Sequence, residues 1–286
     1  MNSINNICVI GSGTMGNGIA HCFAQHGYRV NLLDVNTAAL ELAISKIASN
    51  LDRQIKKEIL SEDDKIKILN NIKTFTDLEL AVVDVDFIVE AASENTTLKL
   101  QIFKDLDKYA KADAILASNT SSISITQIAA VTKRPHKVIG MHFMNPVPVM
   151  KLVEVIKAYD TDAETTKTVM ELAKTLNKIP VEVNDYPGFV ANRILMPMIN
   201  EAIYTLYEGV AGVDEIDTVM KLGMAHPMGP LQLADFIGLD VCLAILNVLY
   251  QGFGNPKYAP CPLLVNMVTA GKYGVKSRKG FYTYNK

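Results

Sequence analysis

The chain has 286 residues, of which 49% are hydrophobic and 20% are charged, and its formal net charge is −2. These values are typical of a globular protein with one large or two modest domains, and they give no electrostatic reason to expect a nucleic acid or a membrane surface as a partner. No apolar stretch reaches the length of a bilayer span, and the first six residues lack the basic region and hydrophobic core of a signal peptide. We therefore expect a cytoplasmic protein.

Four cysteines are spread along the chain: Cys8, Cys22, Cys242 and Cys261. They form no CxxC pair and no metal-ligand spacing, and Cys8 lies inside a predicted buried strand. We therefore expect reduced, mostly structural thiols and no metal site. Nothing in the sequence activates a catalytic thiol.

The first 34 residues predict a βαβ unit. A short apolar strand, residues 7–10, runs into a turn, residues 11–16, that matches the pattern G-x-G-x-x-G. A helical pattern follows and ends near Gly27, and a second strand, residues 29–34, closes on Asp34. These parts in this order are typical of a dinucleotide site, whereas the glycines alone would fit a turn in an unrelated α/β protein.

Each part of this unit has a physical role in holding a dinucleotide. Gly11 permits the tight turn, Gly13 lets the backbone approach a pyrophosphate, and Gly16 allows close packing of helix and strand. The helix begins within the same pattern, at Thr14 and Met15, and presents free N–H groups to the anion. The carboxylate that closes the second strand would accept hydrogen bonds from the ribose hydroxyls, and no arginine directly follows it to receive a 2′-phosphate. The pattern therefore predicts NAD as the cofactor.

Residues 37 to about 73 form a helical, highly charged stretch that is longer than a crossover connection needs. Charge of this kind is usually a solvated helix face. A helical pair projecting from the nucleotide-binding sheet could also use one or two of its lysines to hold an anionic ligand.

Two further strands, residues 85–90 and 114–118, are each followed by polar residues and then a helix. In open α/β sheets, ligands bind beyond the carboxyl ends of the strands. Glu94, Asn119 and Ser121 fall at this edge and are candidate ligand contacts. The hydroxyl groups near Ser121 would serve equally well as helix N-caps.

The stretch from His142 to Pro146 carries the candidate chemistry. Residues 138–141 and 151–156 indicate two strands joined by a proline-punctuated turn, which would bring the imidazole of His142 near the carboxylate of Glu154. A neutral imidazole can take a proton from an alcohol, and a carboxylate beside it fixes the tautomer and favours the imidazolium. The alternative is a structural histidine at a strand end and a solvated glutamate.

The pattern changes near residue 185. A helix over residues 163–176 and a last strand over residues 180–183 precede it, and the sequence beyond it is mainly helical, with helices predicted over residues 189–207, 213–222, 231–250 and 263–269. We place the domain boundary at this shift. The expected fold is α/β, with an N-terminal Rossmann-type dinucleotide-binding domain, residues 1–185, that carries the helical insertion near residues 37–73, and an all-α C-terminal domain for substrate binding and dimerisation, residues 186–286.

The predicted helix over residues 189–207 has two features that bear on function. Asn192 lies one turn into a mainly apolar helix, where a substrate carbonyl or a neighbouring backbone group could satisfy it. The helix is apolar on more than one face, which indicates either a subunit interface in addition to a core or a fully covered core helix.

The chain resembles the L-3-hydroxyacyl-CoA dehydrogenase family, and within it the short-chain bacterial 3-hydroxybutyryl-CoA dehydrogenases. The matching pieces cover nearly the whole chain in order: residues 11–16, 118–122, 142–146, 151–156, 187–193 and 280–282. The resemblance implies that NAD accepts a hydride from a 3-hydroxyacyl-CoA thioester, or that NADH returns it to the 3-oxoacyl-CoA, in fatty acid or butanoate metabolism. It favours a four-carbon acyl group. From the apolar faces of the helix over residues 189–207 we expect a homodimer or a higher homo-oligomer.

The resemblance further implies roles for individual residues. His142 would be the general acid–base and Glu154 its orienting partner, while Ser121 and Asn192 would hydrogen-bond the reacting oxygen or the thioester carbonyl. Lys57 matches a family lysine that contacts coenzyme A, but Asn50 stands where some relatives have serine. Four residues match positions near the nicotinamide half or ribose of the cofactor: Glu94, Lys99, Asn145 and Lys276.

Three rival functions are less consistent with these residues. A β-hydroxyacid dehydrogenase acting on a free carboxylate would use a catalytic lysine in the helical domain, where this chain has Asn192 and Arg193. A non-catalytic, crystallin-like protein of the same fold would be expected to lack part of the catalytic set. One half of a fused β-oxidation enzyme would be expected to carry a hydratase portion, for which the chain is too short.

Overall fold

A computed structural model gives the fold of the protein and describes residues 4–285. The chain divides into two compact units, Met1–Asp185 and Tyr186–Lys286. The first unit contains eight strands: β1 (Asn6–Ile10), β2 (Arg29–Leu33), β3 (Ile72–Phe75), β4 (Phe87–Glu90), β5 (Ile115–Ser118), β6 (Val138–Phe143), β7 (Leu152–Lys157) and β8 (Ile179–Asn184).

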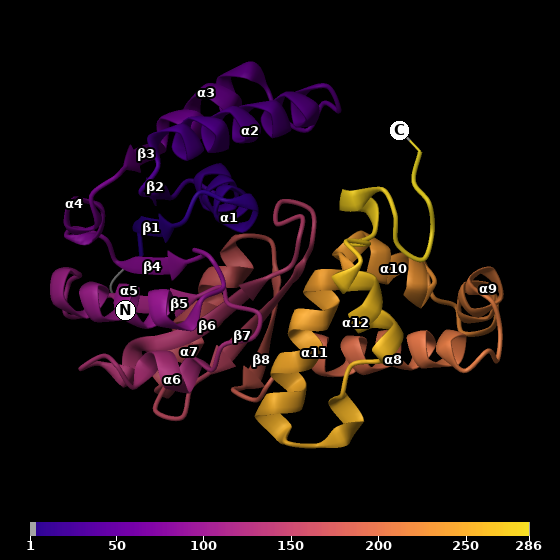
Figure 1. The fold of residues 1–286 in the computed structure, drawn as a ribbon. Coiled ribbons are helices and arrows are strands. Elements are labelled where there is room, and N and C mark those ends of the chain that lie inside the picture. Colours follow the sequence, from indigo (N-terminus) through magenta and orange to yellow (C-terminus); the bar gives the residue numbers. More distant parts are fainter. Residues whose placement is uncertain (1–3, 286) are drawn as a thin grey trace. The chain divides into compact units, whose positions relative to one another are not determined.

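These strands form one sheet in the order β3-β2-β1-β4-β5-β6-β7-β8 (Figure 1). Neighbouring strands are parallel except β6 and β7, which are antiparallel. The carboxyl ends of β1 to β6 therefore share one edge of the sheet, and the strand order reverses between β1 and β4. In sheets of this kind the ligand site lies at such a reversal.

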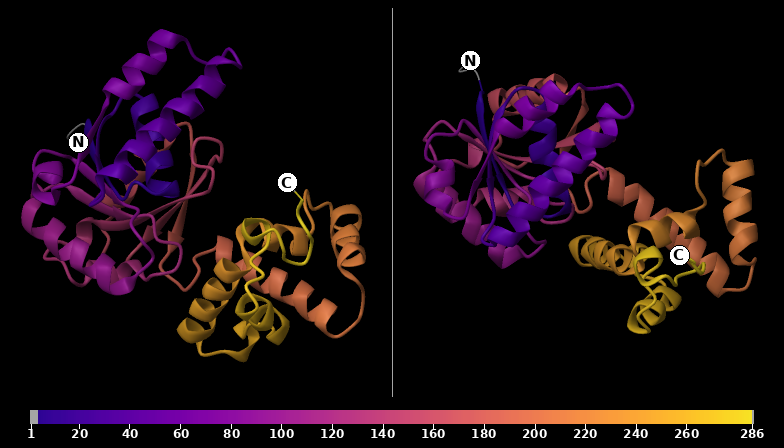
Figure 2. Two further views of the ribbon diagram at one scale, coloured as in Figure 1. Left: turned by 45° about the horizontal axis from the view of Figure 1, so that its top comes forward. Right: turned by 90° about the horizontal axis from the view of Figure 1, so that it is seen from above.

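Helices connect the parallel strands and cover the sheet. They are α1 (Thr14–Gln25), α2 (Thr37–Ile55), α3 (Glu62–Asn70), α4 (Leu78–Val82), α5 (Thr96–Tyr109), α6 (Ile125–Ala129) and α7 (Ala163–Thr175), with a 3-10 turn at Pro135–Lys137. Figure 2 shows α2 and α3 as a helical pair on the outside of the first unit. A capping box between Ser61 and Asp64 starts α3, because each residue accepts a hydrogen bond from the backbone N–H of the other.

The first unit differs from the sequence prediction between residues 72 and 82. The helical pattern was expected to reach about Lys73, but β3 begins at Ile72, and α4 follows at Leu78. The strand is short and lies at the edge of the sheet, with only its two end residues partly buried. Its sequence therefore lacks the continuous apolar run that a central parallel strand shows.

The second unit is helical. Its helices are α8 (Ala191–Tyr207), α9 (Val213–Gly223), α10 (Pro230–Ile237), α11 (Leu239–Phe253) and α12 (Pro262–Thr269), with 3-10 turns at Pro256–Tyr258 and Val275–Ser277. They pack around a core that includes Met196, Ile199, Leu231, Cys242 and Leu246. Together the two units confirm the expected fold class, a mostly parallel α/β sheet followed by an all-α part.

The prediction of one helix in the second unit is wrong. A single helix was predicted over residues 231–250, but the chain bends by 97° between α10 and α11. Gly238 lies at the break with φ +103, a conformation that L side chains rarely adopt. The apolar pattern continues across the glycine because both helices contribute to the same core, and it therefore concealed the bend.

Two buried carboxylates hold the C-terminal segment of the second unit. Asp235 is 0% exposed and accepts hydrogen bonds from the backbone N–H groups of Phe281 and Tyr282, at 3.0 and 2.9 Å. Asp217 accepts one from the hydroxyl of Tyr282 at 2.9 Å. A Cβ atom at Gly280 would approach Asp235 Oδ1 to 1.8 Å, so this packing needs glycine at position 280. Within residues 4–285 no single helix is long and apolar enough to cross a membrane.

Candidate active site

His142 and Glu154 are register partners on the antiparallel strands β6 and β7. Side chains of directly opposite residues lie on the same face of a sheet, and the imidazole Nδ1 lies 2.9 Å from Glu154 Oε2. Both residues are largely buried, with 7% and 2% exposed. The proline-punctuated turn after His142 includes a cis peptide bond between Asn145 and Pro146. The sequence prediction that these two side chains lie within reach of one another agrees with this geometry.

Ser121 lies on the other side of the same imidazole. Its Oγ is 3.0 Å from His142 Nε2. A carboxylate can only accept a hydrogen bond, so Glu154 requires the proton of the neutral imidazole on Nδ1. The lone pair of Nε2 then accepts a hydrogen bond from the Ser121 hydroxyl. The three residues thus hold a basic nitrogen next to a hydroxyl group at the carboxyl ends of β5 and β6.

Glu94 fixes the loop that carries Ser121. Its Oε1 accepts hydrogen bonds from Thr120 Oγ1 at 2.5 Å, from Ser121 N at 3.1 Å and from Ser122 Oγ at 2.7 Å. Burial alone would raise the pKa of Glu94, but the Thr120 hydroxyl, the charge of Lys99 and the Ser122 hydroxyl together hold that pKa below its usual value. Glu94 is therefore an anion in the folded protein, and its negative charge is available beside the active-site loop.

Glu94 contacts the buried ion pair between Lys99 and Glu90. Lys99 Nζ donates to Glu90 Oε1 at 2.6 Å and to Ala92 O at 3.2 Å, and it lies 3.4 Å from Glu94 Oε2. The second oxygen of Glu90 accepts a hydrogen bond from Ser118 Oγ at 2.7 Å. Lys99 is only 1% exposed. The lysine expected near the cofactor is thus a buried group that contacts Glu94.

Asn119 ties two strands together at the same edge. Its Oδ1 accepts a hydrogen bond from Phe143 N at 2.9 Å, and the side chain is 7% exposed. Asn119 follows β5, and Phe143 is the last residue of β6. The asparagine therefore fixes the spacing of the two strand ends that carry Ser121 and His142.

The glycine-rich turn has the geometry that a dinucleotide requires. Gly11 has φ +93, and a Cβ atom there would approach Ala91 O to 2.7 Å. A Cβ atom at Gly16 would approach Gly11 O to 1.7 Å, whereas none of the described residues lies within 4 Å of the corresponding position at Gly13. Backbone close to Gly13 is therefore open to a ligand, at the N-terminus of α1, which begins at Thr14 and Met15. These residues fit a bound pyrophosphate.

Asp34 lies at the end of β2 and is held in place by the same turn. Its Oδ2 accepts hydrogen bonds from Ser12 N at 2.8 Å and from Ser12 Oγ at 2.7 Å, and its Oδ1 accepts one from Asn36 N at 3.1 Å. Burial alone would raise the pKa of Asp34, but the hydroxyl and N–H of Ser12 and the N–H of Asn36 lower it. The carboxylate is thus a fixed anion, which fits ribose hydroxyls and disfavours a 2′-phosphate.

A cavity of about 320 Å³ lies beside the dinucleotide turn, between α1, α2 and the turn after β6. Asn145 lines it on one side, and Lys46, Asn50 and Arg53 line it from α2. We refer to it as the α2 cavity. Lys57, which follows the end of α2, is exposed and does not line the α2 cavity.

Two candidate residues belong to the second unit. Asn192 is in the first turn of α8, and its backbone N–H donates to Gly188 O at 3.1 Å. Lys276 lies in the last 3-10 turn and forms an ion pair with Asp240 of α11. The Lys276 side chain therefore has an acidic partner within its own unit.

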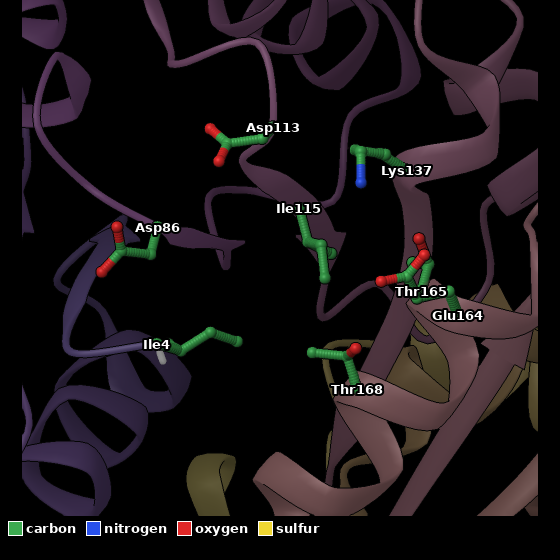
Figure 3. A pocket seen from close by; sticks show the side chains of 8 residues that line it. All are labelled: Ile4, Asp86, Asp113, Ile115, Lys137, Glu164, Thr165 and Thr168. Carbon is green, nitrogen blue, oxygen red and sulfur yellow. The ribbon is translucent and has the colours of Figure 1, made fainter. Parts of the chain in front are cut away.

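A second cavity, of about 340 Å³, lies away from this chemistry. Its lining residues include Asp86, Asp113 and Lys137, which precede β4, β5 and β6, so it lies at the amino ends of the strands. Figure 3 shows Asp86 and Asp113 on one side of it and Lys137 and Glu164 on the other. No group of three or more histidine, cysteine, aspartate or glutamate side chains among residues 4–285 is arranged to hold a metal ion.

The cysteines lie in the interior. All four are buried and free, and burial raises the pKa of the Cys22 thiol to about 11 and that of Cys242 to about 12. A thiol with such a pKa is not a nucleophile near neutral pH.

Sequence reasoning missed Glu90, Lys46 and Arg53. Glu90 ends an otherwise apolar strand and is 0% exposed. A charged residue at such a position needs a partner, and that requirement was the available signal. Lys46 and Arg53 lie on α2, and the many charges of that helix were interpreted as a solvent-exposed face.

Both units of the chain match family descriptions. Residues 6–186 match the 3-hydroxyacyl-CoA dehydrogenase NAD binding domain, and residues 188–284 match the 3-hydroxyacyl-CoA dehydrogenase C-terminal domain. The first unit is thus an NAD-binding domain, in agreement with the predicted cofactor.

Proteins named 3-hydroxybutyryl-CoA dehydrogenase are similar to the chain over nearly its whole length. A probable 3-hydroxybutyryl-CoA dehydrogenase of Bacillus subtilis (strain 168) is 54% identical over 281 residues, which cover 98% of each chain. A 3-hydroxybutyryl-CoA dehydrogenase of Clostridioides difficile is 52% identical, covering 98% of this chain and 99% of the other. The crystal structure of (S)-3-hydroxybutyryl-CoA dehydrogenase from Ralstonia eutropha superposes with a TM-score of 0.96 at 50% identity, covering 99% of this chain and 100% of that chain. The chain therefore belongs to the 3-hydroxyacyl-CoA dehydrogenase family.

Proposed function

We propose that this protein catalyses the NAD-dependent interconversion of (S)-3-hydroxybutyryl-CoA and acetoacetyl-CoA, as part of fatty acid or butanoate metabolism. The names of its relatives support the substrate class. The observation that carries the proposal is the chain of contacts from Ser121 through His142 to Glu154. It provides a base for an alcohol at the carboxyl edge of an NAD-binding sheet.

In this proposal His142 Nε2 takes the proton of the substrate hydroxyl. NAD, when bound, supplies the acceptor for the hydride that leaves C3. Glu154 stabilises the positive charge that develops on the imidazole, because its carboxylate is already hydrogen-bonded to Nδ1. In the opposite direction the imidazolium returns the proton to the carbonyl oxygen. Ser121 Oγ, which lies beside Nε2, is positioned to hydrogen-bond the same oxygen.

We assign the remaining candidates to supporting roles. Glu94 orders the Thr120–Ser122 loop and offers a negative charge to the nicotinamide half of the cofactor, and Lys99 acts through Glu94 because its own ammonium group is buried. Asn119 acts through the spacing of the strand ends. We assign Asn192 to the thioester carbonyl and Lys276 to the cofactor.

The α2 cavity is our candidate for the coenzyme A chain. Lys46 and Arg53 bring two positive charges to it, Asn50 adds a carboxamide, and no acidic residue among residues 4–285 lines it. Coenzyme A is a polyanion, and arginine and lysine recognise its phosphates by charge and hydrogen bonding. Asn145 links the cavity to the strand that carries His142.

We also propose that the protein is a homodimer or a larger homo-oligomer. Several large apolar side chains of the second unit are exposed, among them Ile194 at 66%, Leu222 at 83% and Phe236 at 55%. Exposed apolar side chains of this size are candidates for a subunit contact. Light scattering on the purified protein measures the assembly directly. A cytoplasmic location stays a prediction from the sequence.

The decisive experiment is oxidation of NADH, followed at 340 nm, with acetoacetyl-CoA as substrate. Free acetoacetate and NADPH serve as parallel substrates. The proposal requires rapid turnover only with NADH and the CoA thioester. Turnover of free acetoacetate alone would reject coenzyme A recognition and leave only the dinucleotide domain assigned.

A further inference from the structure

A third cavity, of about 240 Å³, lies further along α1 than the α2 cavity. Its polar lining comes from three segments: Gln25 and His26 from the end of α1, Gln54 from α2, and Lys151, Asn177 and Lys178 from the β7 and β8 ends. We refer to it as the Lys178 cavity. No acidic side chain among the described residues lines it. Its polar groups are therefore neutral or positive.

Lys178 is the unusual member of this set. It is only 8% exposed, yet no ion pair within residues 4–285 involves it. Its Nζ donates to Val147 O at 2.5 Å and to Met150 O at 2.8 Å. Burial of a charge is costly unless a counter-charge is present, and an ammonium group has three N–H donors. The two carbonyl groups that Lys178 contacts are neutral, so they do not balance the positive charge of its ammonium group.

The positive charge of Lys178 also acts on the nearby side chain of His21. Burial lowers the pKa of His21 to about 4. A hydrogen bond with Gln25 opposes this shift, and the positive charges of His26 and then Lys178 add smaller contributions in the same direction as burial. Lys151 adds a second, exposed lysine at the mouth of the cavity. Two lysines, two glutamines and an asparagine around one small cavity match the needs of a phosphate group, which accepts several hydrogen bonds and carries negative charge.

The Lys178 cavity and the α2 cavity follow the same two helices. Gly18 of α1 lines the α2 cavity and Gln25 lines the Lys178 cavity, a separation of about 10 Å along the helix axis at 1.5 Å per residue. Arg53 and Gln54 of α2 line one cavity each, and Pro148 lines both. An extended ligand that enters the α2 cavity near the active site would therefore reach the Lys178 cavity with its far end.

We propose that the Lys178 cavity binds a terminal phosphate monoester, and that the ligand is the 3′-phosphate of the coenzyme A chain whose middle part lies in the α2 cavity. This proposal rests on the proposed function for the identity of the ligand. The same chemistry would also accept free inorganic phosphate. The experiment below separates the two sources.

The test compares acetoacetyl-CoA with 3′-dephospho-acetoacetyl-CoA under steady-state conditions. We expect the wild type to show a KM about tenfold higher for the dephospho substrate, since hydrogen bonds to a charged group contribute on this scale. Lys178→Gln should bring that ratio close to one. Because Lys178 also holds the backbone of the 147–150 turn, Lys151→Gln is the cleaner variant. It removes an exposed charge and should lower the ratio about two- to fivefold, with the KM for the dephospho substrate unchanged.

The matched control is Lys104→Gln, which removes an exposed charge on α5 outside both cavities and should leave the ratio at its wild-type value. Calorimetric binding of adenosine 3′,5′-bisphosphate, 5′-AMP and inorganic phosphate provides a readout that does not depend on turnover. Tighter binding of the bisphosphate than of 5′-AMP, lost in Lys151→Gln, supports the proposal even if the chain turned over a different substrate. Binding of inorganic phosphate without any preference for the bisphosphate would overturn the coenzyme A assignment. Equal ratios in wild type and both cavity variants would overturn the phosphate site itself.

Discussion

Glu90 and Lys99 form an ion pair with a distance of 2.6 Å between Oε1 and Nζ, and their side chains are 0% and 1% exposed. Lys99 reaches Glu94 as well, at 3.4 Å. Glu94 in turn accepts the hydrogen bonds that order the loop of Ser121. A buried pair at the end of β4 is thus connected by direct contacts to the imidazole of His142.

We expect Glu90→Gln to destabilise the first unit by about 3 kcal/mol, because it leaves the ammonium group of Lys99 buried without its main counter-charge. Urea denaturation measures the change. The double variant Glu90→Gln/Lys99→Met removes both charges and should recover most of the loss. A double variant less stable than Glu90→Gln would contradict the view that the unpaired charge is the cause.

We expect His142→Gln to lower kcat by about 10²- to 10⁴-fold, because glutamine cannot take up the proton of the substrate hydroxyl. Single-turnover kinetics and fluorescence titration with NADH separate chemistry from cofactor binding, and the Kd for NADH should change little. Unchanged turnover would refute the role that we assign to His142.

We expect Glu154→Gln to lower kcat by about 10²-fold or more, because a neutral amide no longer stabilises the imidazolium and can present its NH₂ group to Nδ1, which would favour the wrong tautomer. The effect should appear in kcat and leave the KM for NADH nearly unchanged. Glu171→Gln, which alters an exposed carboxylate of α7, is the matched control. Equal losses in the two variants would show that the effect is one of overall charge.

The pairing of His142 with Glu154 could be predicted from the sequence, because two short strands joined by a turn place opposite residues on one face. The pair of Glu90 and Lys99 could not, since it joins a strand end to the first turns of the following helix and depends on how α5 packs against the sheet. Periodicity also failed at Gly238, where one apolar pattern spans two helices. The positively charged linings of the α2 and Lys178 cavities could not be predicted either, because their residues come from segments that are far apart in the sequence. Lys178 is distant in sequence from the turn whose carbonyls it contacts.

Cofactor choice provides a separate prediction at Asp34. We expect Asp34→Ala to reduce the preference for NADH over NADPH by about tenfold or more, because the carboxylate that would repel a 2′-phosphate and bind the ribose hydroxyls is removed. The ratio of kcat/KM for the two cofactors measures the effect. Since Asp34 also accepts two hydrogen bonds from Ser12, thermal unfolding should accompany the kinetics. A preference that stays constant in a folded variant would show that Asp34 does not select the cofactor.

The pH dependence of stability should reflect His21. This residue is 0% exposed, and no described residue hydrogen-bonds its Nδ1. Burial above all lowers its pKa from the ordinary value of 6.5 to about 4. The unfolded chain therefore binds a proton at a higher pH than the folded chain does. The contribution of His21 to the free energy of unfolding is complete above pH 6.5 and falls as the pH drops from about 6.5 to 4.

Between pH 8 and pH 5 we expect this single residue to account for a loss of about 2 kcal/mol in the free energy of unfolding of the first unit. His21→Gln should make the stability less pH-dependent by that amount, whatever its effect at pH 8. His136→Gln, at an exposed histidine of the same unit, is the matched control for the loss of a histidine. Urea denaturation at several pH values measures all three proteins. A His21→Gln profile parallel to the wild type would mean that burial does not lower the pKa of His21 in the folded chain.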